Sequence, residues 1–128
     1  MTTERHPDIE VYVKNSSPRA LINWLTDISE GLSVVKSRGA SHEFSCTLSG
    51  VAIPVLIEER VVGKPWLSIW FNSAQTPWQV DLDCAKAITE ALNVQTRCIV
   101  DGWREGDEPD EWWRVTSEGA EKIIWKTE

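Results

Sequence analysis

The chain has 128 residues, about the length of one domain, and a formal net charge of −7 at pH 7. Its 41% hydrophobic and 26% charged residues are ordinary values for a globular protein, so the composition argues against a disordered chain. The excess of acids argues against nucleic acid as a partner, because phosphate backbones repel such a chain. We expect a single domain over residues 1–128, with residues 1–7 frayed.

The cysteines and the N-terminal residues bear on the compartment. Cys46, Cys84 and Cys98 are odd in number and widely spaced, which argues against a disulfide framework and against a CxxC site. The first residues contain no apolar run of the kind that marks a secretory signal, and no stretch approaches the ~20 apolar residues of a membrane span. We therefore expect a cytoplasmic protein with reduced thiols, with no membrane contact, no metal and no cofactor.

The first half of the chain predicts one strand, one helix and three more strands. Residues 9–13 alternate apolar with polar side chains, which is typical of a strand buried on one face. Ser17 is a suitable N-cap and Pro18 a suitable first helical residue, followed by apolar residues at helical spacing. Gly31 is the expected end of this helix. Further strands are expected over residues 32–38, 42–49 and 51–57.

The second half predicts a central strand, a second helix and a closing hairpin. Pro54, in the preceding strand, cannot donate a ladder hydrogen bond, which predicts an edge strand or a bulge there. Residues 66–72 are apolar on both faces, as in a central strand covered on both sides. Thr76 and Gln79 form a capping box for a helix that ends near Asn93. A strand over residues 94–100, a polar loop over 101–111, and a hairpin over 112–117 and 120–126 complete the chain.

This order predicts an α+β fold, in which two β-α-β-β-β units form a curved, mostly antiparallel sheet with two helices packed on one face. The residues Asn-Ser precede a proline-started helix in both units. Either an internal duplication or the common chemistry of strand-to-helix turns accounts for that similarity.

The tryptophans are the most unusual feature, because there are eight of them. Trp24 belongs to the apolar stripe of the first helix. A recognition surface or groove would suit the strand tryptophans, since indole offers a large area and a polar N–H. Alternatively, these rings fill the second face of a bent sheet, as a barrel-like interior or a dimer interface. The candidates for a contact on the sheet face opposite the helices are Trp66, Trp70, Trp113 and Trp125.

An acidic loop between two tryptophans is the first-ranked interaction site. It is long for a hairpin loop, and long ordered loops are often functional. It does not match the calcium-binding EF-hand pattern, because tryptophans stand where acids are needed. A docking loop for a cationic partner is the functional interpretation, and a solvated acidic loop is the alternative. Its candidate contact residues are Trp103, Glu105, Asp107, Glu108, Asp110, Glu111 and Trp112.

Signals for catalysis are weak. His6 lies in the part expected to fray, and His42 begins a strand at a distance from any cysteine that could act as its partner. The three cysteines are expected to be inert core thiols. The sequence contains no G-x-S-x-G elbow, no G-x-G-x-x-G run and no Walker pattern. We therefore assign no catalytic residue and lean against an enzyme.

Two functional hypotheses remain, from different classes. The first is a non-enzymatic interaction domain for a basic protein partner, which in its size and acidity is similar to bacterial immunity or inhibitor proteins. The second is a metal-free small-molecule-binding barrel or cryptic enzyme, because paired β-α-β-β-β units resemble the vicinal oxygen chelate group. The chain departs from that group in lacking the His and Glu ligands that face its cavity; Glu58 alone lies at a comparable strand end. Homodimerisation through the apolar sheet face is a further possibility.

Overall fold

The computed structural model describes residues 8–61, 66–99 and 111–125. None of the helices in these ranges is long and apolar enough to cross a membrane. The elements are β1 (Ile9–Lys14), α1 (Pro18–Ile28), β2 (Gly31–Arg38), β3 (Ser41–Leu48), β4 (Val51–Glu59), β5 (Trp66–Phe71), α2 (Asp81–Leu92), β6 (Thr96–Ile99), β7 (Glu111–Thr116) and β8 (Gly119–Ile124).

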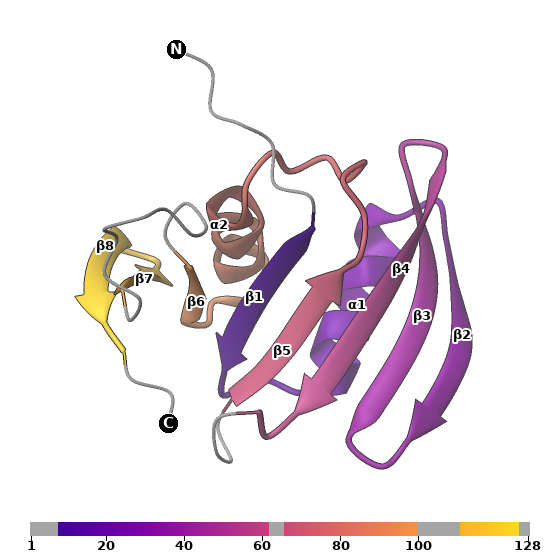
Figure 1. The fold of residues 1–128 in the computed structure, drawn as a ribbon, viewed down its shortest axis with the longest axis horizontal. Helices are drawn as coiled ribbons and strands as arrows, with labels where there is room; N and C mark the ends of the chain where they lie inside the picture. Colours follow the sequence, from indigo (N-terminus) through magenta and orange to yellow (C-terminus); the bar gives the residue numbers. More distant parts are fainter. Residues whose placement is uncertain (1–7, 62–65, 100–110, 126–128) are drawn as a thin grey trace.

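The described strands form one open sheet in the order β2-β3-β4-β5-β1-β6-β7-β8 (Figure 1). All neighbouring strands are antiparallel. The predicted α+β fold with a curved, open antiparallel sheet is confirmed. The first strand in sequence, β1, lies inside the sheet between β5 and β6.

The two β-α-β-β-β units follow each other as predicted but enter the sheet differently. From β1 the chain crosses to the far edge at β2 and returns inward through β3 and β4. From β5 it passes over β1 to β6 and then proceeds outward to β8. Since one unit runs inward and the other outward, the repeated Asn-Ser-Pro turns reflect local turn chemistry more than a duplicated arrangement.

The helices cover one face of the sheet, and the main core lies between them and the strands. In Figure 1, α1 lies behind the strands, and α2 is seen nearly end-on beside β1 and β6. The buried side chains of β1 show why one face is apolar: Ile9, Val11 and Val13 are fully enclosed, while Glu10 is exposed. The central strand β5 is buried along nearly its whole length, as its two apolar faces predict.

The start of α1 is encoded locally. The Ser17 hydroxyl accepts a hydrogen bond from the Ala20 N–H at 3.1 Å, and Pro18 occupies the first helical turn. Both assignments agree with the sequence prediction. The end of the helix does not, because Ser29 is the C-cap and Gly31 already belongs to β2.

The predicted capping box of α2 is wrong. The helix begins at Asp81 after Val80, whose side chain makes no capping hydrogen bond. The Thr76 hydroxyl donates to the Trp78 carbonyl at 2.9 Å, so it serves the turn that precedes the helix. Asn93 ends the helix in the left-handed conformation, as predicted.

The prediction that Pro54 marks an edge or a bulge is also wrong. β4 lies between β3 and β5, and its register with β3 runs through Pro54 without a shift. The Pro54 carbonyl accepts from the Asn72 N–H at 3.0 Å, one residue beyond the end of β5. Because the N and C=O of a strand residue point to the same side, the missing N–H faces a position where β5 has already ended.

Candidate functional site

The sheet face opposite the helices, here called the helix-free face, carries an unusual set of side chains. The register places Tyr12 of β1 beside Ser68 of β5 and Arg97 of β6, all pointing away from the helices. Two residue pairs along, and therefore on the same face, Glu10 lies opposite Trp70. This face therefore combines aromatic rings with charges of both signs.

Four aromatic residues on this face form one cluster, the aromatic cluster: Tyr12, Trp66, Trp112 and Trp125. The Trp125 ring lies 4.7 Å from that of Trp66, 5.0 Å from that of Trp112 and 5.7 Å from that of Tyr12. Tyr12 and Trp112 meet edge to face at 5.3 Å. Trp125 follows β8, so its ring ties the edge of the sheet back to its central strands.

A cation of the chain itself occupies the aromatic cluster. The Arg97 guanidinium lies 4.9 Å from the Trp66 ring and 4.5 Å from the Trp125 ring, and its Nε donates to Gln95. Burial, and then the charge of Arg114, lower the pKa of Arg97. With its cation position filled and Trp66 only 6% exposed, the cluster acts as a small second core.

Trp70 lies outside the aromatic cluster and lines a groove on the same face. The groove, here called the Trp70 groove, holds about 260 Å³. Trp70 is half-buried, and its indole N–H donates to the Asp8 carboxylate at 2.7 Å. Val35, which is 63% exposed, contributes from the bulge of the edge strand β2. Its lining residues are Val35, Glu43, Phe44, Pro54, Val55, Leu56, Trp70 and Asn72.

One carboxylate lines this groove and two more lie next to Trp70. Glu10 lies opposite Trp70 in the register, Glu43 lines the groove itself, and Asp8 binds the indole. Although Glu10 is exposed as a residue, neighbouring atoms partly desolvate its carboxyl group, which raises its pKa, and the charges of Asp81, Asp8 and Glu58 raise it further. The carboxylates that add to this shift place negative charge beside the groove, which a cation brought into the groove would relieve.

The structure brings together only some of the residues proposed from sequence. Trp66, Trp70 and Trp125 lie on the helix-free face, as expected. Trp113 does not: it lies opposite the buried Cys98 and packs against the main core. Its neighbour Trp112 takes the predicted place, because adjacent strand residues point to opposite faces and nothing in the sequence said which of the two pointed outward.

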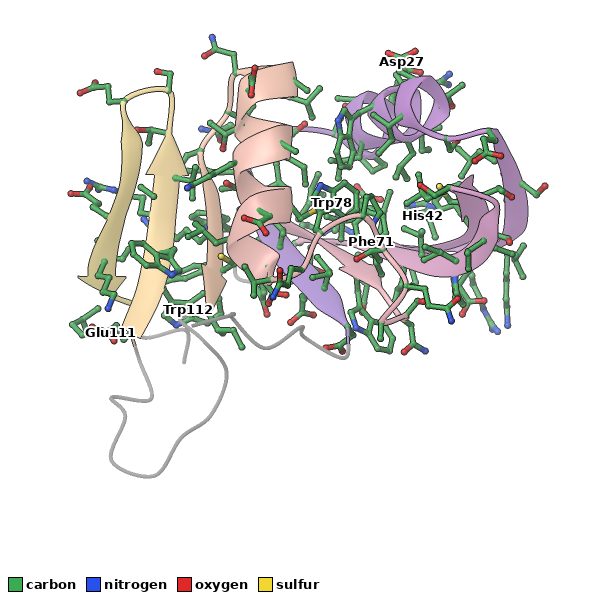
Figure 2. All side chains as sticks on the ribbon, turned by 90° about the horizontal axis from the view of Figure 1, so that it is seen from above. Asp27, His42, Phe71, Trp78, Glu111 and Trp112 are labelled. Atoms are coloured by element: carbon green, nitrogen blue, oxygen red, sulfur yellow. The ribbon has the colours of Figure 1, made fainter. Side chains whose placement is uncertain are left out.

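The acidic loop lies mostly outside the described residues. Of its candidate contacts, Glu111 and Trp112 begin β7, and Figure 2 shows them at the same end of that strand. Trp103, Glu105, Asp107, Glu108 and Asp110 fall in the range that the structure does not describe.

A second polar constellation lies on the opposite side of the sheet, among β2, β3 and β4. Ser37 Oγ lies 2.6 Å from His42 Nδ1, and His42 Nε2 lies 2.9 Å from a Glu59 carboxylate oxygen. The sequence analysis considered only a cysteine as the partner of His42 and did not predict these contacts with Ser37 and Glu59. The missed signal is Gly39, which with Ala40 makes a two-residue turn and so pairs Ser37 with His42.

The three cysteines lie apart from both constellations. Cys46, Cys84 and Cys98 are free and fully buried. Burial raises the pKa of all three thiols, and the nearby carboxylate of Asp81 raises it further for Cys84 and Cys98. A thiol that resists ionisation is a poor nucleophile and a poor metal ligand.

Within the described ranges, no group of three or more His, Cys, Asp or Glu side chains is arranged to hold a metal ion. Comparisons with protein-family models, with curated proteins and with solved structures find no match.

Proposed function

We propose that the protein is an interaction domain that binds a basic segment of a partner protein on its helix-free face, with the Trp70 groove as the anchoring contact. The observation that supports this most directly is the half-buried Trp70 ring in an apolar groove that Glu43 lines, with Glu10 and Asp8 next to Trp70. The other tryptophans of that face are engaged with one another and with Arg97.

The size and chemistry of the groove favour a long cationic side chain. Its volume is below the ~300–1,000 Å³ typical of small-molecule pockets, but it suffices for one or two side chains. The methylene stem of a lysine or arginine would pack on Val35, Leu56 and Trp70, while its charge would lie near Glu10 and Glu43. The net charge of −7 adds a long-range attraction for such a partner.

The acidic loop is also part of this proposal, on the basis of its sequence. Its end at Trp112 adjoins the aromatic cluster on the helix-free face. The acids Glu105, Asp107, Glu108, Asp110 and Glu111 would add to the negative charge that attracts a basic partner in the cytoplasm.

The test measures binding of a fluorescein-labelled hexalysine peptide by anisotropy at ~0.1 M salt. The Glu10→Gln/Glu43→Gln double variant removes two charges beside the groove. Its matched control, Asp27→Asn/Glu90→Gln, removes two charges from the exposed surfaces of α1 and α2. Since exposed charge pairs contribute ~0.2–1 kcal/mol each, we expect the groove variant to bind about three- to tenfold more weakly and the control less than twofold.

Two outcomes would contradict the proposal. Equal weakening by both variants would mean that the peptide responds only to total charge. Failure of the unaltered protein to bind hexalysine more tightly than a hexaglutamine peptide would remove the preference for a basic partner altogether.

A further inference from the structure

We infer that Ser37, His42 and Glu59 form a catalytic triad for acyl transfer, with Ser37 as the nucleophile and esters of short, apolar carboxylic acids as the substrate class. This activity is independent of the Trp70 groove, because the triad lies on the helix side of β2, β3 and β4 and the groove is on the helix-free face.

Three neighbouring strands hold the three side chains in line. Ser37 of β2 lies opposite His42 of β3, and His42 lies opposite Ile57 of β4. Ile57 is buried in the main core, so the side chains of Ser37, His42 and Ile57 all point to the helix side, where Figure 2 also places His42. Glu59 follows two residues later on the same strand and therefore on the same face. The pairing of the three strands thus fixes the direction of each side chain.

The hydrogen bonds indicate which atom of the three side chains carries each proton. An ionised Glu59 can only accept, so the His42 Nε2–H donates to it at 2.9 Å. In the neutral imidazole the lone pair then lies on Nδ1, which faces the Ser37 hydroxyl at 2.6 Å. The hydroxyl proton therefore points at the base. Nucleophile, base and orienting acid within hydrogen-bond reach of each other are the arrangement that activates a serine.

The two partners of Ser37 are less exposed than Ser37 itself. Ser37 is exposed, the His42 side chain is 17% exposed and that of Glu59 27%. An acyl donor can therefore approach the hydroxyl while the base and the acid are largely shielded. Val34, which is 67% exposed on the same strand, offers an apolar surface for a short acyl chain.

The free edge of β2 supplies a donor for the developing oxyanion. In the turn at Gly39–Ala40, the carbonyl of Arg38 faces Ser41, so the backbone groups of Ser37 point the other way. β2 pairs with β3 alone in the described sheet, so the Ser37 N–H faces outward. A backbone N–H on the nucleophile itself is a common oxyanion donor.

The reaction proceeds in two balanced steps. Ser37 Oγ bonds to the ester carbonyl carbon and its proton passes to His42 Nδ1, while Glu59 stabilises the imidazolium. The C–O bond to the alcohol breaks, and the alcohol leaves with the proton from Nδ1. Water then attacks the acyl-serine, giving its proton to Nδ1. The carboxylic acid leaves as Ser37 Oγ recovers the proton.

The test uses p-nitrophenyl butyrate and a fluorophosphonate probe on the full chain. We expect ester hydrolysis with an initial burst, and a covalent adduct in the Glu-C peptide of residues 31–43. Ser37→Ala should abolish the burst and the adduct, and His42→Gln should slow hydrolysis ~100-fold or more. Ser33→Ala is the matched control, because Ser33 lies on the same strand with its side chain on the helix-free face.

Other outcomes would overturn the triad. Hydrolysis by Ser37→Ala at the unaltered rate would assign the reaction to another group, and an adduct on Ser33 or Ser41 would assign it to non-specific labelling. The melting temperature of each variant is measured alongside, and Glu59→Gln separates chemistry from folding. This variant keeps the shape of the acid, so intact folding with normal activity would equally refute the assignment.

Discussion

At the residue scale, a pair of threonines forms a polar contact that is enclosed in the core. The Thr96 hydroxyl donates to the Ala85 carbonyl at 3.1 Å, and the Thr89 and Thr96 hydroxyls lie 2.8 Å apart. Both side chains are buried where α2 packs on β6. Buried hydroxyls of this kind stabilise a fold only while each keeps its partner.

Thr96→Val should therefore destabilise the protein although it preserves shape. It removes the bond to Ala85 and leaves the Thr89 hydroxyl with only the Val115 carbonyl at 3.4 Å. We expect the free energy of unfolding to fall by about 1–2 kcal/mol in urea denaturation. Thr26→Val on the exposed face of α1 is the control, with an expected change within about 0.5 kcal/mol. Equal effects of the two substitutions would refute this account.

The sequence identified the kinds of residue that matter but not all of their directions. The placement of Trp66, Trp70 and Trp125 on the helix-free face follows from the strand pattern, whereas the part of Tyr12 in the aromatic cluster was not predicted. The choice between Trp112 and Trp113 does not follow from that pattern, because a shift of one residue reverses the face and both rings are equally apolar. The contact between His42 and Glu59 joins two strands, and such partners are decided by register.

At the scale of elements, α2 begins without a side-chain cap. Val80 has extended backbone angles suited to an N-cap, but its side chain cannot accept from the first helical N–H groups. Asp81 and Asp83 offset this partly, since negative charge favours a helix N-terminus.

Val80→Ser should add the missing cap. Val80→Ala removes the same packing without supplying an oxygen, so the pair of variants isolates the capping hydrogen bond. We expect the serine variant to exceed the alanine variant by about 1 kcal/mol in the free energy of unfolding, measured by thermal or urea denaturation. Two variants of equal stability would show that this helix start is already satisfied.

Elements with local signals were predicted well, and those with competing local signals were not. Ser17 and Pro18 cap α1 as expected because capping involves only the next few residues. Thr76 does not cap α2 because the helix begins only at Asp81, and the Thr76 hydroxyl donates to the Trp78 carbonyl in the turn before it. Pro54 fails as an edge marker because tolerance of proline depends on where the neighbouring strand β5 ends.

At the scale of the whole molecule, the alternation of side chains gave the fold class, but the strand order lay beyond it. Hairpins such as β3–β4 join neighbours in sequence. The pairings of β1 with β5 and β6 join segments more than fifty residues apart, as the register of Val13 with Leu67 shows. Such contacts depend on the closure of long loops and on packing against both helices.

The thiols report on opening of the whole fold. Because burial raises the pKa of Cys46, Cys84 and Cys98, all three should resist Ellman's reagent in the native protein at pH 8. In 8 M urea we expect three equivalents to react, and the native rate should follow the unfolding rate measured by fluorescence. A thiol that reacts in the native state at the rate of a free peptide would contradict its burial.

The interior position of β1 has a consequence for biosynthesis. While the ribosome makes residues 8–61, the hairpins of β2, β3 and β4 already have their partners, but β1 has none until β5 is made, and its second partner, β6, follows later. The nascent chain must therefore keep β1 unpaired while all the residues between β1 and β5 are synthesised. β1 is synthesised before both of its partners and joins the sheet late. Without β1, the sheet would divide into β2–β5 and β6–β8.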